Sequence, residues 1–203
     1  MTNYEKLKIA LEWQLIGLWY NKALKAFNLA KKYHNWLRKD WVTNEFKHQV
    51  DICLYLLTLK VDNSEMEDLI TSALLHDIRE DYGIEHVYIN DNFWNKIATS
   101  VEKLTKKFNN IKKPYDLYFD ELANDYLASL VKWADRINNI STMVWVFSTT
   151  KQLEYVKEVE VYFLPMLKKA RKNFPENTLA YLNIETILKQ QVFFIKEINK
   201  NVD

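Results

Sequence analysis

The 203-residue sequence predicts an all-α fold, and two observations lead to it. First, it contains only 2 Gly and 3 Pro, whereas an average domain has about 7% Gly and 5% Pro. Because β-rich folds place these residues in their many turns, the scarcity excludes sandwiches, propellers and sheets of many hairpins. Second, capping sequences and apolar residues at helical spacing recur along the whole chain.

Composition also excludes several kinds of function. Gly17 and Gly83 stand alone, so no glycine-rich phosphate loop is present. The single cysteine, Cys53, excludes a disulfide framework and a cysteine-based zinc site, and it suits a small core residue. A formal net charge of +1 argues against duplex nucleic acid as a partner. No apolar run reaches the roughly 18 residues of a membrane span and no secretory signal is recognisable, so we expect no membrane contact and a cytoplasmic location.

Capping sequences place the first residues of several helices. Thr2 with Glu5, and Ser64 with Glu67, have the spacing of a capping box, in which a hydroxyl and a carboxylate satisfy the first free N–H groups. Asp125 suits the N-cap of a long helix. The helices predicted in this way cover about residues 2–18, 21–36, 44–60, 64–77, 92–106, 125–147, 151–171 and 177–200.

The connections are predicted from residues that break helices. Residues 38–43 read as a polar connection, and Gly83 interrupts the helical pattern. Residues 106–113, with four lysines, form the most polar linker, and Pro114 fits the first turn of the next helix. Pro165 predicts a kink within 151–171. With no internal repeat and no composition shift, we expect a single domain.

The adjacent pair His76-Asp77 is the first candidate for chemistry. It follows the apolar helical segment 70–75, at the point where the sequence turns polar. An imidazole and a carboxylate there can converge on one cation, and this donor set suits Mn, Fe, Co or Zn. Glu80-Asp81 follows three residues later. A His-Asp pair alone is common at helix ends, where it serves as a cap or as surface.

Two further segments strengthen this interpretation. His48 lies on the preceding predicted helix, 28 residues upstream of His76. Asp135, Asn139 and Thr142 are spaced i, i+4, i+7 and share one helix face. The residues that flank this polar stripe are apolar: Val131, Ala134 and Ile140. The stripe is therefore predicted to line a pocket rather than to face bulk solvent.

These residues, in this order, resemble the HD superfamily of metal-dependent phosphohydrolases. More narrowly, they resemble the hydrolase domain of RelA/SpoT homologues, which removes the 3′-pyrophosphate of the alarmone (p)ppGpp. An HDxxED run is matched at 76–81 and a K-x-A-D-R-x-x-N-x-x-T-like run at 132–142, and Arg38-Lys39 matches a pair that precedes the first histidine. Weaker similarity at 101–105 and 158–165 extends the resemblance over about residues 18–170.

The resemblance implies a role for each residue of the motifs. The implied ligands of one Mn²⁺ ion are two histidines and two aspartates: His48, His76, Asp77 and Asp135. Glu80 and Asp81 are implied to orient a water molecule and accept its proton. Implied substrate contacts are Arg38, Lys39, Asn139, Thr142 and Tyr162. The resemblance predicts an HD-type helical bundle over 18–203 with an added helical extension at 1–17, and a small stand-alone hydrolase without a synthetase domain.

The chain also departs from the family before His48. A segment that is usually rich in Gly and Pro and ends in His-Pro is here residues 40–48, followed by Gln49. It is about one residue longer and has no residues typical of a tight turn, which affects the placement of Arg38 and Lys39 most.

Other functions remain open at this level. An HD-type nucleotidase or phosphatase could act on NADPH or a (d)NMP, and a non-catalytic module could sense a nucleotide. His34 and His86 are predicted to be structural or exposed, and the lysines around 108–113 to form a solvated loop. The sequence makes no prediction of oligomeric state.

Overall fold

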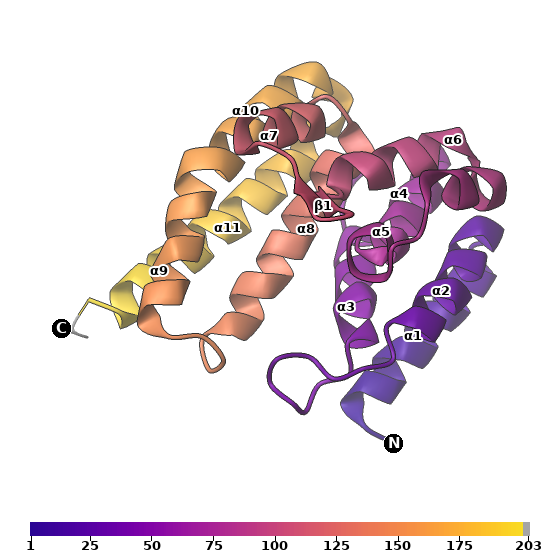
Figure 1. Cartoon of the computed structure of the whole chain (residues 1–203), viewed down its shortest axis with the longest axis horizontal. Helices are drawn as coiled ribbons and strands as arrows, with labels where there is room; N and C mark the ends of the chain where they lie inside the picture. The colour runs from indigo at the N-terminus through magenta and orange to yellow at the C-terminus, as the bar shows by residue number, and fades with distance from the viewer. Residues whose placement is uncertain (201–203) are drawn as a thin grey trace.

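The computed structural model describes residues 1–200 and confirms the all-α prediction within them (Figure 1). Its only strands within that range form one short hairpin. The elements follow in this order: α1 (Asn3–Gly17), α2 (Asn21–Tyr33), α3 (Phe46–Leu56), α4 (Asn63–Leu75), α5 (Ile78–Tyr82), α6 (His86–Leu104), β1 (Lys107–Phe108), β2 (Ile111–Lys112), α7 (Tyr115–Ala123), α8 (Tyr126–Met143), α9 (Thr149–Glu158), the π-helical turn η1 (Val159–Phe163), α10 (Leu164–Asn173), the short 3₁₀ helix η2 (Pro175–Asn177) and α11 (Thr178–Ile198).

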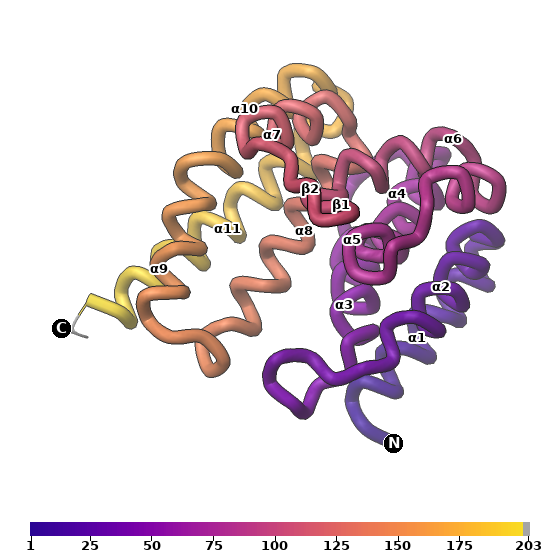
Figure 2. Tube along the Cα trace, viewed as in Figure 1, coloured from indigo at the N-terminus to yellow at the C-terminus, as the bar shows by residue number. Residues whose placement is uncertain are grey.

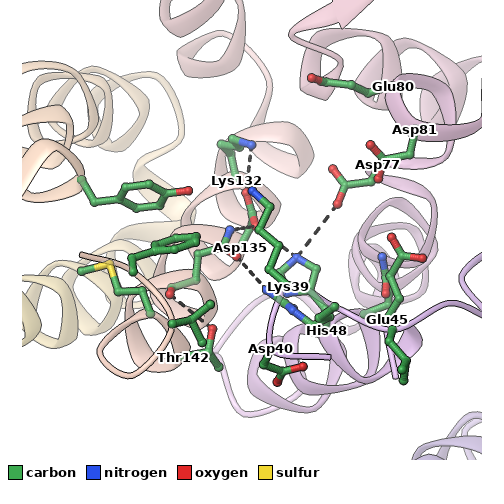
Figure 3. Close-up of a pocket in the computed structure, with 18 of the residues that line it drawn as sticks. Lys39, Asp40, Glu45, His48, Asp77, Glu80, Asp81, Lys132, Asp135 and Thr142 are labelled. Atoms are coloured by element: carbon green, nitrogen blue, oxygen red, sulfur yellow. Dashed lines mark hydrogen bonds and ion pairs between the residues drawn. The ribbon is translucent and has the colours of Figure 1, made fainter. Parts of the chain in front are cut away.

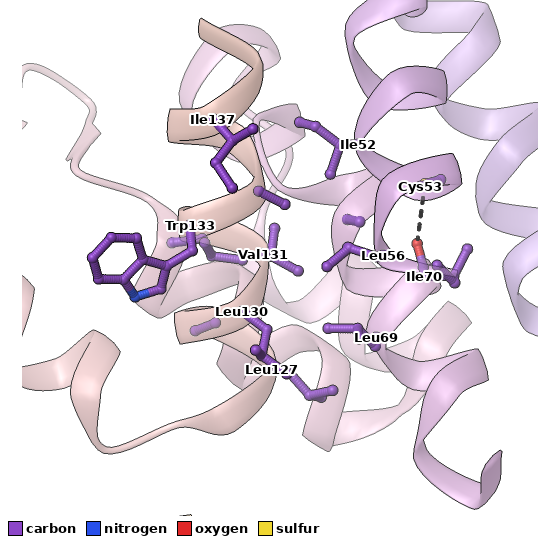
Figure 4. Close-up of a cluster of buried hydrophobic side chains, with 14 of the residues drawn as sticks. Ile52, Cys53, Leu56, Leu69, Ile70, Leu127, Leu130, Val131, Trp133 and Ile137 are labelled. Carbon is purple, nitrogen blue, oxygen red and sulfur yellow. Dashed lines mark hydrogen bonds between the residues drawn. The ribbon is translucent and has the colours of Figure 1, made fainter. Parts of the chain in front are cut away.

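Helix α8 runs through the centre of the molecule. It packs against α3, α4 and α6 on one side and against α7, α10 and α11 on the other, as the path of the chain in Figure 2 shows. Where α3, α4 and α8 meet, Leu56, Leu69 and Leu130 are fully buried (Figure 4). Burying each such side chain stabilises the fold by about 1.5–3 kcal/mol. This apolar contact fixes the spacing of the three helices that carry the candidate ligands.

Two of the predicted caps are confirmed. Glu5 N donates to Thr2 Oγ1 at 3.2 Å and Thr2 N donates to Glu5 Oε2 at 2.7 Å, which completes the capping box of α1. Asp125 Oδ1 accepts from Ala128 N at 3.0 Å at the start of α8. Leu11 and Leu15 of α1 are fully buried, and this helix packs on α2 and α3.

The cap predicted for α4 is wrong. Asp62, not Ser64, is the N-cap, and its Oδ1 accepts from Ser64 N at 2.8 Å. Glu67 does not close a capping box, because its Oε1 accepts from the backbone N of Lys22 at 2.7 Å and ties α4 to α2. The Ser64 hydroxyl itself donates to Asp62 Oδ1 at 2.7 Å, so the serine is engaged by the N-cap aspartate instead of capping the helix.

The segment from 86 to 113 differs most from the prediction. Helix α6 begins at His86 rather than near Asn92, and it breaks at Trp94, whose φ of 71° and ψ of 157° are not helical. The predicted linker contains the hairpin β1–β2, in which Asn109 and Asn110 both have positive φ. Two such residues in succession form the turn that suits a tight hairpin, and asparagine tolerates this conformation.

The remaining differences from the prediction concern the ends of the helices. Three predicted ends are late by three or four residues: α2 ends at Tyr33, α3 at Leu56 and α8 at Met143. The prediction of a kink or break at Pro165 is confirmed as an interruption of the α-helix, because the π-helical turn η1 separates α9 from α10 and the proline occupies the first turn of α10. The predicted range 18–203 ends in 201–203, which lie outside the described residues. Across the described residues, no helix combines the length and apolarity needed to cross a bilayer.

Candidate active site

A cavity of about 410 Å³ opens beside the N-terminal half of α3. Its walls come from the segment before α3, from the α4–α5 junction, from Lys106, and from α8, α9 and their connection. Figure 3 shows Asp77 and Asp135 on either side of His48 within it. Segments far apart in the sequence thus bring the predicted ligands together.

Two imidazoles and two carboxylates meet at this cavity. His48 Nε2 lies 3.2 Å from Asp135 Oδ1 and 4.0 Å from Asp77 Oδ2. His76 Nε2 lies 2.8 Å from Asp77 Oδ2, and the two imidazole rings are 5.3 Å apart. One donor atom from each of His48, His76 and Asp77 lies within 4.8 Å of the others. We call the four residues His48, His76, Asp77 and Asp135 the first cluster.

Local structure explains how Asp77 reaches the cavity, while His76 is buried next to it and does not line the cavity. Helix α4 ends at Leu75, His76 is its C-cap, and Asp77 is the N-cap of the short helix α5. The break between the two helices turns both side chains towards α3 and α8. Gly83 then ends α5 with φ of 66°, a left-handed conformation that glycine adopts without steric cost.

Hydrogen bonds set the orientation of both imidazoles. His48 Nδ1 donates to Asn138 Oδ1 at 2.7 Å, and Asn138 Nδ2 in turn donates to Asp51 at 3.4 Å. His76 Nδ1 donates to Ala73 O at 2.7 Å. With Nδ1 protonated, each neutral ring presents the lone pair of Nε2 to the first cluster, as a metal-binding histidine does. The sequence interpretation did not name Asn138, although it follows Asp135 by one helical turn.

The first cluster fits a divalent cation. His76 is 1% exposed, and its Nε2 faces Asp77 Oδ2 at 2.8 Å. A buried imidazole lone pair and a carboxylate oxygen this close repel each other unless a proton or a metal ion lies between them. Two carboxylates beside it offset the charge of a divalent ion, and imidazole with carboxylate is a set that Mn²⁺, Fe²⁺ and Zn²⁺ accept.

The charges of the first cluster depend on one another. Burial disfavours a charged His76, but Asp77 and Asp135 outweigh it and raise its pKa to about 9. Burial likewise opposes ionisation of Asp77, yet His76 lowers the pKa of that carboxyl to about 2. Lys132 Nζ lies 2.8 Å from Asp135 Oδ2 and, with His48, holds the pKa of Asp135 well below its usual range despite burial. A metal ion would therefore replace the proton of His76.

Glu80 and Asp81 lie at the rim of the cavity. Desolvation, reinforced by the charges of Asp77 and Glu45, raises the pKa of Asp81 to about 7. A carboxylate with a pKa near neutrality is suited to accept a proton. Glu80 Oε2 accepts from the backbone N of Lys106 at 2.8 Å, which ties α5 to the start of the hairpin.

The opposite wall carries Arg38 and Lys39. The Arg38 guanidinium donates to Asn139 Oδ1 at 3.1 Å, and Lys39 Nζ lies 5.5 Å from the centre of the Phe147 ring. The expectation that this segment lacks a tight turn is wrong. Asp40 Oδ1 accepts from Val42 N at 2.9 Å, and Trp41 adopts φ of 58° without being glycine.

Not every predicted contact reaches the cavity. Tyr162 is absent from its lining and stacks on Phe119, with 5.2 Å between ring centres and 13° between planes. Tyr155 lines the cavity instead. Tyr162 lies within the π-helical turn η1, which follows α9 with Tyr155 and changes the helical register. Thr142 lines the cavity and donates to Asn138 O at 3.1 Å.

The remaining lining residues were missed. Glu45, Gln49, Lys106 and Lys132 are polar and line the cavity, and Lys106 pairs with Glu158 at 3.5 Å. Lys132 stands within the 132–142 motif, three residues before Asp135. This position in the motif is the sequence signal that could have identified it.

The helical bundle brings two histidines and two aspartates together beside one cavity, which is the arrangement that the resemblance to the HD superfamily implies. No protein-family model matches the chain. It is 28% identical to the guanosine-3′,5′-bis(diphosphate) 3′-pyrophosphohydrolase of Aquifex aeolicus over 189 residues, which are 88% of this chain and 26% of that protein. It is 27% identical to a probable chloroplastic GTP diphosphokinase, RSH2, of Arabidopsis thaliana over 158 residues, which are 70% of this chain and 21% of that protein.

These two relatives confirm the resemblance to the HD hydrolase domain of RelA/SpoT homologues. The chain spans about a quarter or less of the length of the curated relatives it matches.

Proposed function

We propose that the protein is a metal-dependent hydrolase that removes the 3′-pyrophosphate of (p)ppGpp. The observation that carries the proposal is the buried Nε2 of His76, which lies 2.8 Å from the carboxylate of Asp77. The name of the Aquifex aeolicus relative supplies the reaction and the substrate.

The first cluster supplies the ligands in this proposal. His48, His76, Asp77 and Asp135 would hold one Mn²⁺, with Asn138 and Ala73 O fixing the two rings. When bound, such an ion lowers the pKa of a coordinated water and polarises a phosphoryl oxygen. Lys132 keeps Asp135 ionised and therefore available as a ligand.

Proton transfer falls to the rim carboxylates. Asp81, with its pKa near 7, accepts the proton of the attacking water, and Glu80, held by Lys106 N, orients that water. Both residues stand on α5, the helix that begins directly after Asp77.

The rest of the cavity suits a nucleotide with several phosphates. Lys106 and Lys39 offer positive charge to pyrophosphate oxygens, while Arg38 is positioned by Asn139. Phe147 and Tyr155 form an aromatic end against which a guanine base can stack. Lysines and aromatic rings thus lie in one cavity with the first cluster.

A substrate panel tests the proposal. Purified protein, stripped of metal and reloaded with Mn²⁺, is incubated with ppGpp, NADPH and a set of (d)NMPs, with metal-free protein as the control. We expect metal-dependent turnover of ppGpp at a higher kcat/KM than of the others. Preferred turnover of NADPH or a (d)NMP favours a nucleotidase, and ppGpp binding without turnover favours a non-catalytic sensor.

A further inference from the structure

A second group of potential ligands lies beside the first cluster. His34, Glu45 and Asp81 each offer one donor atom, and these three atoms lie within 4.8 Å of one another. We call them the second cluster. Its residues come from the end of α2, from the residue that caps α3, and from α5. Glu45 and Asp81 also line the cavity.

His34 has the features of a ligand without its ion. Its side chain is fully buried, and its Nδ1 has no hydrogen-bond partner. That nitrogen faces Glu45 Oε1 at 3.8 Å, which is too long for a hydrogen bond. Two donors bound to one transition-metal ion at about 2.0–2.2 Å each lie roughly 3–4 Å apart, so the gap suits a bridging cation.

Gln49 explains how His34 can present a lone pair to this gap. The Gln49 amide lies 3.3 Å from His34 Nε2, and its own Oε1 is buried without a partner. Rotating the amide by 180° exchanges its oxygen and nitrogen, so that His34 Nε2–H donates to Oε1. Nδ1 then carries the lone pair, and the second nitrogen is held as in other metal-binding histidines.

The charges of the second cluster also call for a cation. Among residues 1–200, Glu45 pairs with His34, and no lysine or arginine forms an ion pair with Glu45 or Asp81. Tyr82 supports the group, because its hydroxyl donates to Glu45 Oε2 at 2.7 Å and its ring packs edge-on against His34 at 4.9 Å. Two carboxylates and a neutral imidazole would balance a divalent ion.

We propose that His34, Glu45 and Asp81 bind a second divalent cation of the Mn²⁺, Fe²⁺ or Zn²⁺ class at the edge of the same cavity. Three protein ligands leave coordination positions open to water or to a phosphate oxygen. Because Asp81 also belongs to the proposed reaction, the second ion would hold that carboxylate in place and ionised, able to accept a proton. The inference requires the second cluster alone and not the identity of the substrate.

Counting bound Mn²⁺ tests the second site. Metal-free protein is equilibrated with Mn²⁺ by dialysis, and bound metal per chain is measured by mass spectrometry. We expect two ions in the wild type and one in Glu45→Gln, a substitution that keeps an acceptor for the Tyr82 hydroxyl. Tyr82→Phe is the matched control, since it removes that hydroxyl but no ligand, and it should still bind two ions.

A second pair of variants separates the two sites. Asp77→Asn should lose the ion of the first cluster and keep the other, and Asp77→Asn with Glu45→Gln should bind none. One ion or none in the wild type, or two ions in Glu45→Gln, would overturn the proposal. Because turnover is not measured, two bound ions without ppGpp hydrolysis would refute only the proposed function. One bound ion with ppGpp hydrolysis would refute only the second site.

Discussion

The cavity has two unlike walls. The first cluster stands on α3, the α4–α5 junction and α8, where His48 and Asp135 are buried and hydrogen-bonded. The facing wall is built from the 37–45 segment and from the connection after α8, where Lys39 and Val146 are exposed. In the proposed function, the packed helices, which we call the helix wall, would hold the chemistry, and the facing segments, which we call the loop wall, would bind the substrate.

The largest effect on ppGpp turnover is expected from a substitution in the helix wall. Asp77→Asn removes a charged ligand while keeping the size of the side chain, so the ion should bind poorly and turnover of ppGpp should fall at least ~10³-fold, a loss of several kcal/mol. Pyrophosphate release at fixed Mn²⁺ measures this. His86→Gln is the control, because His86 pairs with Glu102 outside the cavity and should retain full turnover. Wild-type turnover in Asp77→Asn would contradict the ligand assignment.

A smaller effect is expected from the residue behind His48. Asn138→Ala removes the acceptor of His48 Nδ1 and leaves all four ligands in place, so Mn²⁺ affinity should weaken by about 10- to 100-fold. Isothermal titration with Mn²⁺ measures it, with Ser141→Ala on the same helix as a control. Equal affinities of Asn138→Ala and wild type would mean that packing alone orients the ring.

A substitution in the loop wall should change the KM for ppGpp rather than kcat. Lys39→Ala removes an exposed charge, so KM for ppGpp should rise by about 10-fold, on the order of 1 kcal/mol, with kcat almost unchanged. Steady-state kinetics at two salt concentrations measure it, and the difference from wild type should shrink at high salt. A fall in kcat with KM unchanged would place Lys39 in the chemical step. It would contradict the assignment of substrate binding to the loop wall.

The smallest effect concerns stability against pH. In the metal-free protein the pKa of Asp81 is about 7, above its usual value of 3.8. Between these values the unfolded chain releases this proton while the folded protein keeps it, so stability falls as pH rises through that window. Asp81→Asn lacks this loss, and its advantage in Tm over wild type should grow from pH 4 to pH 7. Thermal melts in a chelator test this, and an advantage independent of pH would contradict the raised pKa.

Much of the helix wall could be predicted from the sequence. The order and spacing of His48, His76-Asp77 and Asp135 are specific, and the structure brings these four residues together. Local capping signals also placed α1 and α8, because a cap depends on residues within one turn. These features are encoded in short stretches of sequence.

Other features depend on contacts that are distant in the sequence. No local pattern reveals that Glu67 accepts from the backbone of Lys22, or that the residues of the second cluster lie close together. The break of α6 at Trp94 likewise has no local signal in the sequence. Tyr162, the predicted substrate contact, lies in the π-helical turn and stacks on Phe119, whereas Tyr155, which the sequence interpretation did not name, lines the cavity. The turn of residues 40–43 was missed because Asp40 and a left-handed Trp41 replace glycine there.

The most direct test of the proposed chemistry is product analysis with a single substrate. Mn²⁺-loaded protein is mixed with ppGpp, and GDP, pyrophosphate and orthophosphate are quantified together. The proposal predicts GDP and pyrophosphate in equal amounts, with formation abolished by a chelator and restored by Mn²⁺. Release of orthophosphate in place of pyrophosphate, or no product from protein shown to hold Mn²⁺, would contradict it.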